Sequence, residues 1–149
     1  MRLLRLLVCV LPLVSLAACD ETLSDLTGPT PNLSPTFSSL QAEIFTRTDS
    51  SGRAACTSCH VAGGPANDTG LFFTDAATAY ASLVGRPARF AAGQTLVIPG
   101  DPDNSYLVRK LEGGPNIVGL RMPRNNGPFL TPGQMLVIRR WIQLGAANN

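Results

Sequence analysis

Three long segments rich in glycine and proline do most to limit what this chain can fold into. They cover residues 61–73, 85–104 and 113–130, and none has the apolar periodicity of a helix or a strand. Loops of this length are uncommon in a small domain unless something organises them, and they leave few side chains for a core. We therefore expect a bound group with a large apolar surface to complete the core.

Two helical segments are expected before the second of these loops. In the first, apolar residues recur at i, i+3, i+7 and i+8, which predicts an amphipathic helix with Thr36 or Ser38 as its N-cap. These apolar residues are Phe37, Leu40, Ile44 and Phe45. The second segment, residues 74–84, is rich in alanine, has Thr74 as its candidate cap and ends before Gly85.

A third, short helix is expected from Ser105, its candidate cap, through Leu111, and Gly113 stops it. Strand patterns are almost absent, since only the apolar run at residues 95–99 resembles a strand. The predicted fold class is therefore all-α, with about four helices.

The last helix has the clearest pattern. Thr131 is the expected N-cap, Pro132 takes the first helical position, and Gln134 completes a capping box. Gly145 is a natural C-terminal stop. One apolar stripe runs along the helix and consists of Met135, Ile138, Trp141 and Ile142.

The N-terminus has the pattern of an export signal. Two arginines within residues 1–5 precede an apolar run over residues 6–16 that closes on small residues. The run is shorter than the roughly 20 residues needed to cross a bilayer, so a permanent transmembrane helix is less favoured. The letters LAAC at residues 16–19 resemble the lipobox of bacterial lipoproteins, with an ordinary signal peptide as the alternative. The resemblance implies that Cys19 is acylated and begins the mature chain.

We therefore divide the chain into three parts. Residues 1–18 are the signal peptide, residues 19–36 are a lipidated flexible linker, and residues 37–149 form one domain. The linker is polar and rich in proline, serine and threonine, with an ordered arm packed on the domain as the alternative. Asp20 follows the lipidated position, which in enteric lipoproteins favours the inner membrane. We expect the domain on the periplasmic side of that membrane.

Removal of the signal changes the charge and the cysteine content. It takes two of the 12 basic residues and none of the 10 acidic ones, so the mature chain is neutral and has no footprint for nucleic acid. Cys9 leaves with the signal and Cys19 takes lipid. The remaining pair, Cys56 and Cys59, faces an oxidising compartment.

These two cysteines belong to the motif CTSCH, which ends in His60, the only histidine of the chain. Cys-x-x-Cys-His is the attachment signal of a c-type haem. Each thiol adds to one vinyl group of the porphyrin, and the two-residue spacing lets both sulfurs reach along one edge of the ring. The adjacent imidazole then becomes a ligand of the iron. We expect one covalent haem c, attached through Cys56 and Cys59, with His60 on its iron.

Three other uses of the cysteine pair are weighed against haem. A thioredoxin-like dithiol is expected at the end of a strand in a βαβ pattern, which this sequence lacks. A structural zinc site needs four ligands, and the chain has no second Cys/His pair. A structural disulfide would close only a very small loop.

The sixth position of the iron needs a second donor. Because there is no other histidine, the candidates in the mature chain are Met122 and Met135. Met135 lies on the apolar stripe of the last helix, where core packing explains it. Met122 lies in a polar loop that Pro123 stiffens, so we favour Met122 as the axial ligand. An open or water-bound iron is the alternative.

These features together resemble a class I c-type cytochrome domain, on a bacterial lipoprotein. The narrower similarity is to the cytochrome c-like modules of planctomycete-type and related bacterial exported proteins. It lies in the segments CTSCH, IPGDPDNSYLVRKLEG, RMP and LTPGQMLVIRRWIQLGA. The resemblance implies a class I cytochrome c fold, with long loops wrapped around one haem. It also implies that the first and last helices cross beside the haem, with Phe45 and Trp141 as packing partners.

The resemblance implies single-electron transfer in the periplasm to and from redox partner proteins, by a monohaem protein with histidine and methionine ligands. No nucleophile or acid–base pair points to an enzyme. A haem-bearing subunit docked on a dehydrogenase or oxidase, and a haem-based sensor with an open sixth position, are the alternatives. Tyr80 and Tyr106 are expected in the core. Positive side chains should neutralise the haem propionates, and the candidates are Arg109, Lys110, Arg121 and Arg124.

The lipid anchor gives a first prediction. Cys19→Ser should abolish acylation and release the protein from membranes, because the thiol is the only attachment point for the lipid. Folding should be unaffected, since the domain begins well after Cys19. Membrane fractionation and mass spectrometry of the N-terminus check this, and a wild-type chain with an unmodified N-terminus would rule out the anchor.

Overall fold

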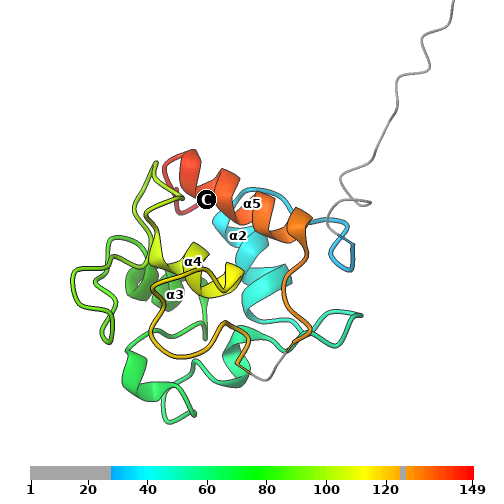
Figure 1. Ribbon diagram of the computed structural model, residues 1–149. Helices are drawn as coiled ribbons and strands as arrows, with labels where there is room; N and C mark the ends of the chain where they lie inside the picture. The colour runs from blue at the N-terminus through cyan, green and yellow to red at the C-terminus, as the bar shows by residue number, and fades with distance from the viewer. Residues whose placement is uncertain (1–27, 125–126) are drawn as a thin grey trace, which may run out of the picture.

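The computed structural model describes residues 28–124 and 127–149, so the predicted signal peptide and Cys19 lie outside the described residues. Within these ranges the chain forms four α-helices joined by long loops, and it has no β-strand (Figure 1). The predicted all-α class is therefore confirmed. No helix in the described ranges has the length and apolar character to cross a membrane. The helices are α2 (Phe37–Leu40), α3 (Ala76–Leu83), α4 (Tyr106–Glu112) and α5 (Pro132–Gln143).

The predicted first helix is present and continues α2 into a π-helical turn, Gln41–Phe45. The Thr36 hydroxyl accepts a hydrogen bond from the Ser39 amide at 3.2 Å, so Thr36 rather than Ser38 is the N-cap. The turn ends where the Thr46 amide donates to the Gln41 carbonyl at 3.1 Å. All four predicted apolar residues of this segment are buried.

The predicted cap of α3 was wrong, and the predicted cap of α4 is confirmed in position only. Asp75, not Thr74, caps α3, because its carboxylate accepts the Thr78 amide at 2.9 Å. Ser105 precedes α4 as expected, but its hydroxyl makes no capping hydrogen bond. It donates instead to the Asp101 carbonyl at 2.7 Å and accepts the Ile98 amide at 2.9 Å. The Ser105 hydroxyl therefore bonds to the loop before α4 instead of to an amide in the first turn of the helix.

The expected strand at residues 95–99 is present only as isolated β-bridges. Val97 pairs with Val84, Thr95 with Pro87, and Ile98 with Asp101. The Tyr106 and Leu107 amides then donate to carbonyls of this segment at 2.9 Å, which holds it against the first turn of α4. The long second loop is thus fixed by scattered backbone pairs rather than by a sheet.

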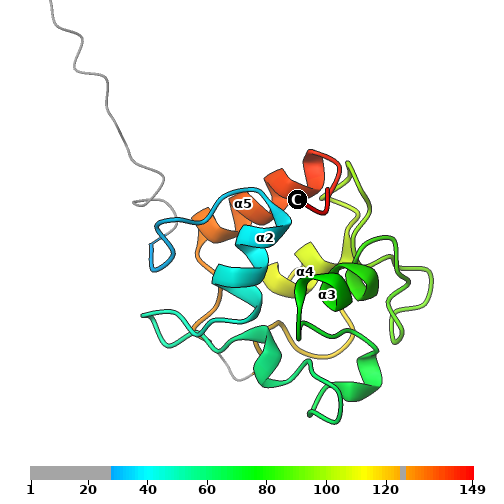
Figure 2. The same ribbon diagram turned by 180° about the vertical axis from the view of Figure 1, so that it is seen from behind.

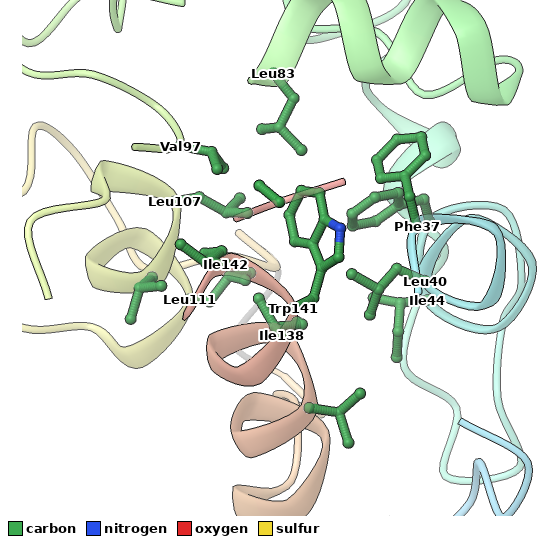
Figure 3. Close-up of a cluster of buried hydrophobic side chains, with 14 of the residues drawn as sticks. Phe37, Leu40, Ile44, Leu83, Val97, Leu107, Leu111, Ile138, Trp141 and Ile142 are labelled. Atoms are coloured by element: carbon green, nitrogen blue, oxygen red, sulfur yellow. The ribbon is translucent and has the colours of Figure 1, made fainter. Parts of the chain in front are cut away.

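Helix α5 follows its prediction closely. Thr131 and Gln134 form the capping box, and Pro132 occupies the first turn. Its apolar stripe is buried, and Trp141 is 1% exposed at the centre of the core between α2, α4 and α5 (Figure 3). Figure 2 shows the same arrangement from behind, with α2 beside α5.

The aromatic packing corrects one expectation from the family resemblance. The ring that packs on Trp141 is that of Phe37, with centroids 5.5 Å apart, rather than that of Phe45. Phe45 packs on Phe37 at 6.1 Å and on Phe73 at 4.4 Å. Phe37, at the start of the first helix, therefore packs against α5. Phe45, at its end, packs against the loop that follows the CTSCH motif.

The linker predicted over residues 19–36 was wrong in its C-terminal part, where the ordered-arm alternative holds. Leu33 is 0% exposed and Thr30 is 1% exposed, so this stretch belongs to the folded domain. The Gln134 side-chain amide donates to the Thr30 hydroxyl at 3.0 Å. A lone leucine in a polar segment has no periodicity to reveal that it is buried.

A buried ion pair organises the segment between the first helix and the cysteines. The Arg53 guanidinium and the Asp49 carboxylate meet at 2.9 Å, with side chains 0% and 1% exposed. Burial alone would raise the pKa of Asp49. Hydrogen bonds from Ser51, Arg53 and Gln134, together with the positive charge of Arg53, outweigh burial and lower it. The carboxylate therefore stays ionised and paired at neutral pH.

This pair gives a second prediction. Arg53→Met should lower the free energy of unfolding by about 3–5 kcal/mol, because it leaves the Asp49 charge buried without its partner. Arg47→Met is the matched control, since the Arg47–Glu43 pair has the same spacing but the Arg47 side chain is 64% exposed. The control should change stability by less than about 0.5 kcal/mol. Denaturant unfolding measures both, and equal effects would contradict the organising role of Arg53.

Candidate functional site

The CTSCH motif folds into one tight turn. A 3₁₀ turn, Cys56–Ser58, brings the Cys59 amide to 3.2 Å and the His60 amide to 2.9 Å from the Cys56 carbonyl. Positions three and four residues apart on a helical turn lie on one side of it. The two thiols and the imidazole therefore start from the same face. Both thiols are free, with Cys56 half-buried and Cys59 exposed.

The His60 ring is held by the loop that follows it. Its Nδ1 lies 3.2 Å from the Leu71 carbonyl, and because a carbonyl only accepts, Nδ1 carries the proton. The lone pair is then on Nε2, as in most histidines that bind a metal. Burial lowers the pKa of His60. The hydrogen bond to Leu71 opposes this shift, and the charge of Lys110 adds to it. The imidazole is therefore neutral and prepared as a ligand.

The loop 61–73 wraps closely around the motif. The Ala66 amide donates to the Cys59 carbonyl at 3.0 Å, and the Phe73 amide donates to the His60 carbonyl at 2.9 Å. The edge of the Phe73 ring meets the His60 ring at 5.7 Å between centroids. A Cβ on Gly64 would lie 2.7 Å from the Cys59 carbonyl oxygen, so only glycine fits there.

A cavity of about 850 Å³ opens beside the motif, and Cys56, Cys59, His60 and Met122 all line it. The structure thus brings together the four residues predicted for the haem. The cavity is at the large end of the roughly 300–1,000 Å³ of ordinary ligand sites. All three long loops contribute to it, together with α4. Its apolar walls include Leu71, Phe73, Leu96, Leu107, Leu111 and Leu130.

The two methionines lie in different environments. Met122 is half-buried on the cavity wall, and its amide donates to the Lys110 carbonyl at 2.9 Å. Met135 is 6% exposed within the hydrophobic core and is not among the residues that line the cavity. Core packing therefore accounts for Met135, as expected.

The predicted basic residues divide into two groups. Lys110 and Arg124 line the cavity. Arg109 binds Gln94 and the Asn104 carbonyl, away from the cavity lining. Arg121 likewise points elsewhere: its Nε donates to the Leu111 carbonyl at 2.7 Å, and its guanidinium lies 3.9 Å from the centre of the Phe129 ring.

Two cavity residues were missed at the sequence level. Arg89 lines the wall but lies in an aperiodic loop, where nothing distinguishes it from other surface charges. Arg53 also reaches the wall, yet its donors are already used. Besides Asp49, it donates to four backbone carbonyls at 3.1–3.3 Å, those of Glu43, Ile44, Arg47 and Ala54. Arg53 therefore supports the cavity rather than offering a charge to a ligand.

The half-buried Cys56 side chain packs against the hydrophobic core. Burial raises the pKa of Cys56 to about 11, and the charge of Arg53 only partly opposes this. The Cys56 sulfur lies 3.8 Å from the Ile44 carbonyl, at the end of the π-helical turn. The thiol is therefore protonated at neutral pH, and Arg53 and the first helix together position it.

These residues fit a covalent haem. The cavity has the size and apolar walls for a large flat ring, two thiols and a neutral histidine share one turn at its edge, and a thioether lies on its wall. A porphyrin supplies four ligands to its iron, so two protein ligands suffice. In the described ranges, no three His, Cys, Asp or Glu side chains are grouped to hold a bare metal ion. Comparisons with protein-family models, curated proteins and solved structures found no match to this chain.

Proposed function

We propose that this protein is a membrane-tethered, monohaem c-type cytochrome of class I that transfers single electrons on the periplasmic side of a bacterial membrane. The observation that carries the proposal is the CTSCH turn at the edge of the 850 Å³ cavity, with Met122 on the wall of the same cavity. A bound haem would supply the one-electron couple of its iron.

Each residue then has a defined task. Cys56 and Cys59 would hold the ring by thioether bonds, and the Leu71 carbonyl would keep the Nε2 lone pair of His60 available for the iron. The thioether of Met122 favours ferrous iron and so raises the reduction potential. The apolar loops exclude water from the ring.

The proposal also assigns the charges that neutralise the haem propionates, the membrane anchor and the redox partners. Besides Arg53, whose donors are already used, the positive side chains on the cavity wall are Lys110, Arg124 and Arg89, and those not otherwise engaged would neutralise the propionates. Cys19 anchors the protein through lipid, with the inner membrane favoured by Asp20, and electrons pass to and from redox partner proteins. A fixed subunit of an oxidoreductase and a sensor with an open iron are the alternatives that the experiments below address.

The third prediction tests covalent attachment. Wild-type protein from cells with a haem-attachment system should give a haem-staining band at the monomer position after denaturing electrophoresis. The double variant Cys56→Ser, Cys59→Ser should lose the stain, because no thioether forms. Cys19→Ser is the matched control, since it removes a cysteine outside the motif and should keep the stain. A wild-type band without stain would end the cytochrome proposal.

The fourth prediction separates the methionines. Met122→Ala should abolish the weak far-red band of thioether-bound ferric haem and lower the reduction potential, because the ferrous form loses its preferred ligand. Met135→Ala should keep the band and lower the free energy of unfolding by about 2–5 kcal/mol, as for other buried methionines. Absorption spectra, redox titration and denaturant unfolding measure these effects. A wild type without the band would favour the sensor with an open iron.

A further inference from the structure

The segment 118–122, which carries Met122, has no regular structure and is held almost entirely by α4. The Tyr106 hydroxyl accepts the Val118 amide at 2.8 Å, near the start of the helix. At the other end, the Leu111 carbonyl accepts the Arg121 side chain at 2.7 Å, and the Lys110 carbonyl accepts the Met122 amide at 2.9 Å. Carbonyls of a last helical turn have no partner within the helix, so they are free to bind this loop.

Lys110 contributes more to this attachment than any other residue. Its ammonium donates to the Val118 carbonyl at 2.9 Å and to the Leu120 carbonyl at 2.5 Å. The Lys110 carbonyl accepts a further hydrogen bond from the Met122 amide, so Lys110 makes three hydrogen bonds to the segment. Bonds from a charged donor are stronger than those between neutral groups.

Glycine at position 113 lets the loop approach the helix end. Gly113 has a φ of 75°, and a Cβ there would lie 2.7 Å from the Arg121 side chain. The chain can therefore turn sharply after α4 and run back along it. Residues 118–122 pass directly over Lys110 as a result.

We propose that Lys110 is the positioning residue of the axial methionine: its ammonium and its carbonyl clamp residues 118–122 onto α4 so that Met122 stays on the haem cavity wall. This inference rests on the proposed function, because it concerns a ligand of the haem iron. Lys110 acts through Met122 and does not itself bind the iron.

The clamp differs from the other role open to Lys110, which is to neutralise a propionate. Two of its three N–H donors are already taken by the Val118 and Leu120 carbonyls. Arg89 and Arg124 lie on the same cavity wall, and no hydrogen bond or ion pair engages either of them among the described residues. The propionate role therefore falls to the arginines, and removing Lys110 should affect the methionine rather than the binding of the ring.

The test compares variants of the full-length, haem-loaded protein. Lys110→Met keeps the apolar stem and removes all three donors, whereas Lys110→Arg restores a charged donor that can reach two carbonyls. Arg86→Met is the matched control, because it removes one exposed positive charge that neither lines the cavity nor touches the clamp. The two readouts are the far-red band of the ferric protein and its affinity for added imidazole, which competes with Met122 for the iron.

Lys110→Met should weaken the far-red band and bind imidazole about tenfold or more tightly than wild type, because the methionine is no longer held in place. Lys110→Arg should recover most of the band, and Arg86→Met should match wild type in band and imidazole affinity. Wild-type values in Lys110→Met would overturn the clamp, as would equal losses in Lys110→Met and Arg86→Met, which would indicate a general effect of losing a positive charge.

Two further variants keep the outcome decisive. If Lys110→Met fails to load haem, Lys110→Gln replaces it, since a neutral amide donates more weakly; its band should fall between those of wild type and the Met122→Ala reference. A Lys110→Gln band equal to that of wild type would overturn the clamp. If Met122→Ala itself leaves the band unchanged, the ligand assignment in the proposed function fails, and this result is distinct from failure of the clamp alone.

Discussion

The buried pair of Asp49 and Arg53 is the interaction on which the site depends most. The Arg53 guanidinium makes one ion pair and four hydrogen bonds to backbone carbonyls, and these span the end of the first helix, the following loop and the residue two before Cys56. Gln134 of α5 donates at 3.4 Å to Oδ2 of Asp49, the same oxygen that pairs with Arg53, and it also donates to Thr30 of the N-terminal arm. Because both charges are removed from water, each partner must be present for the other to be tolerated. The cysteine turn is thus joined through one polar network to the arm, the first helix and the last helix.

The segment that carries Arg53 and the segment that carries Met122 both face the cavity, and both are attached to the fold in the same way. The first helix ends in carbonyls that have no helical partner, and Arg53 binds two of them, those of Glu43 and Ile44. Helix α4 ends in the same way, and the Met122 loop binds the carbonyls of Lys110 and Leu111. Each wall of the cavity is therefore anchored at the C-terminal end of a helix, by donors from an otherwise irregular segment. This explains how a chain with so little regular structure can place side chains reproducibly.

The sequence correctly predicted those elements of the fold that depend on residues close together in the chain. The capping box and apolar stripe of α5 were legible because Thr131, Gln134 and Trp141 follow fixed helical spacings. Ser105 is the N-cap residue of α4 as predicted, but it makes no capping hydrogen bond, because its hydroxyl binds a loop whose path no local rule describes. Arg53 was missed for a related reason: its i, i+4 spacing from Asp49 suggests pairing only in a helix, and this segment has no helical pattern. Leu33 was read as linker because burial of an isolated apolar residue depends on tertiary contacts that lie far away in the sequence.

The cavity itself links the loops to the proposed haem. Its walls come from segments that pair with α4 and with the CTSCH turn but little with one another, so an apolar space of about 850 Å³ lies where a larger protein would have core side chains. Apolar walls of this extent are unfavourable in water, and packing against a large ring would remove them from it. Binding to the folded state alone stabilises that state, so haem attachment and folding of the three loops should reinforce each other. In the proposed haem protein, covalent bonds through Cys56 and Cys59 would make that stabilisation permanent, whereas the proposed clamp at Lys110 would hold only one non-covalent ligand. Of the two walls, the methionine side would thus be the one that opens without loss of the ring.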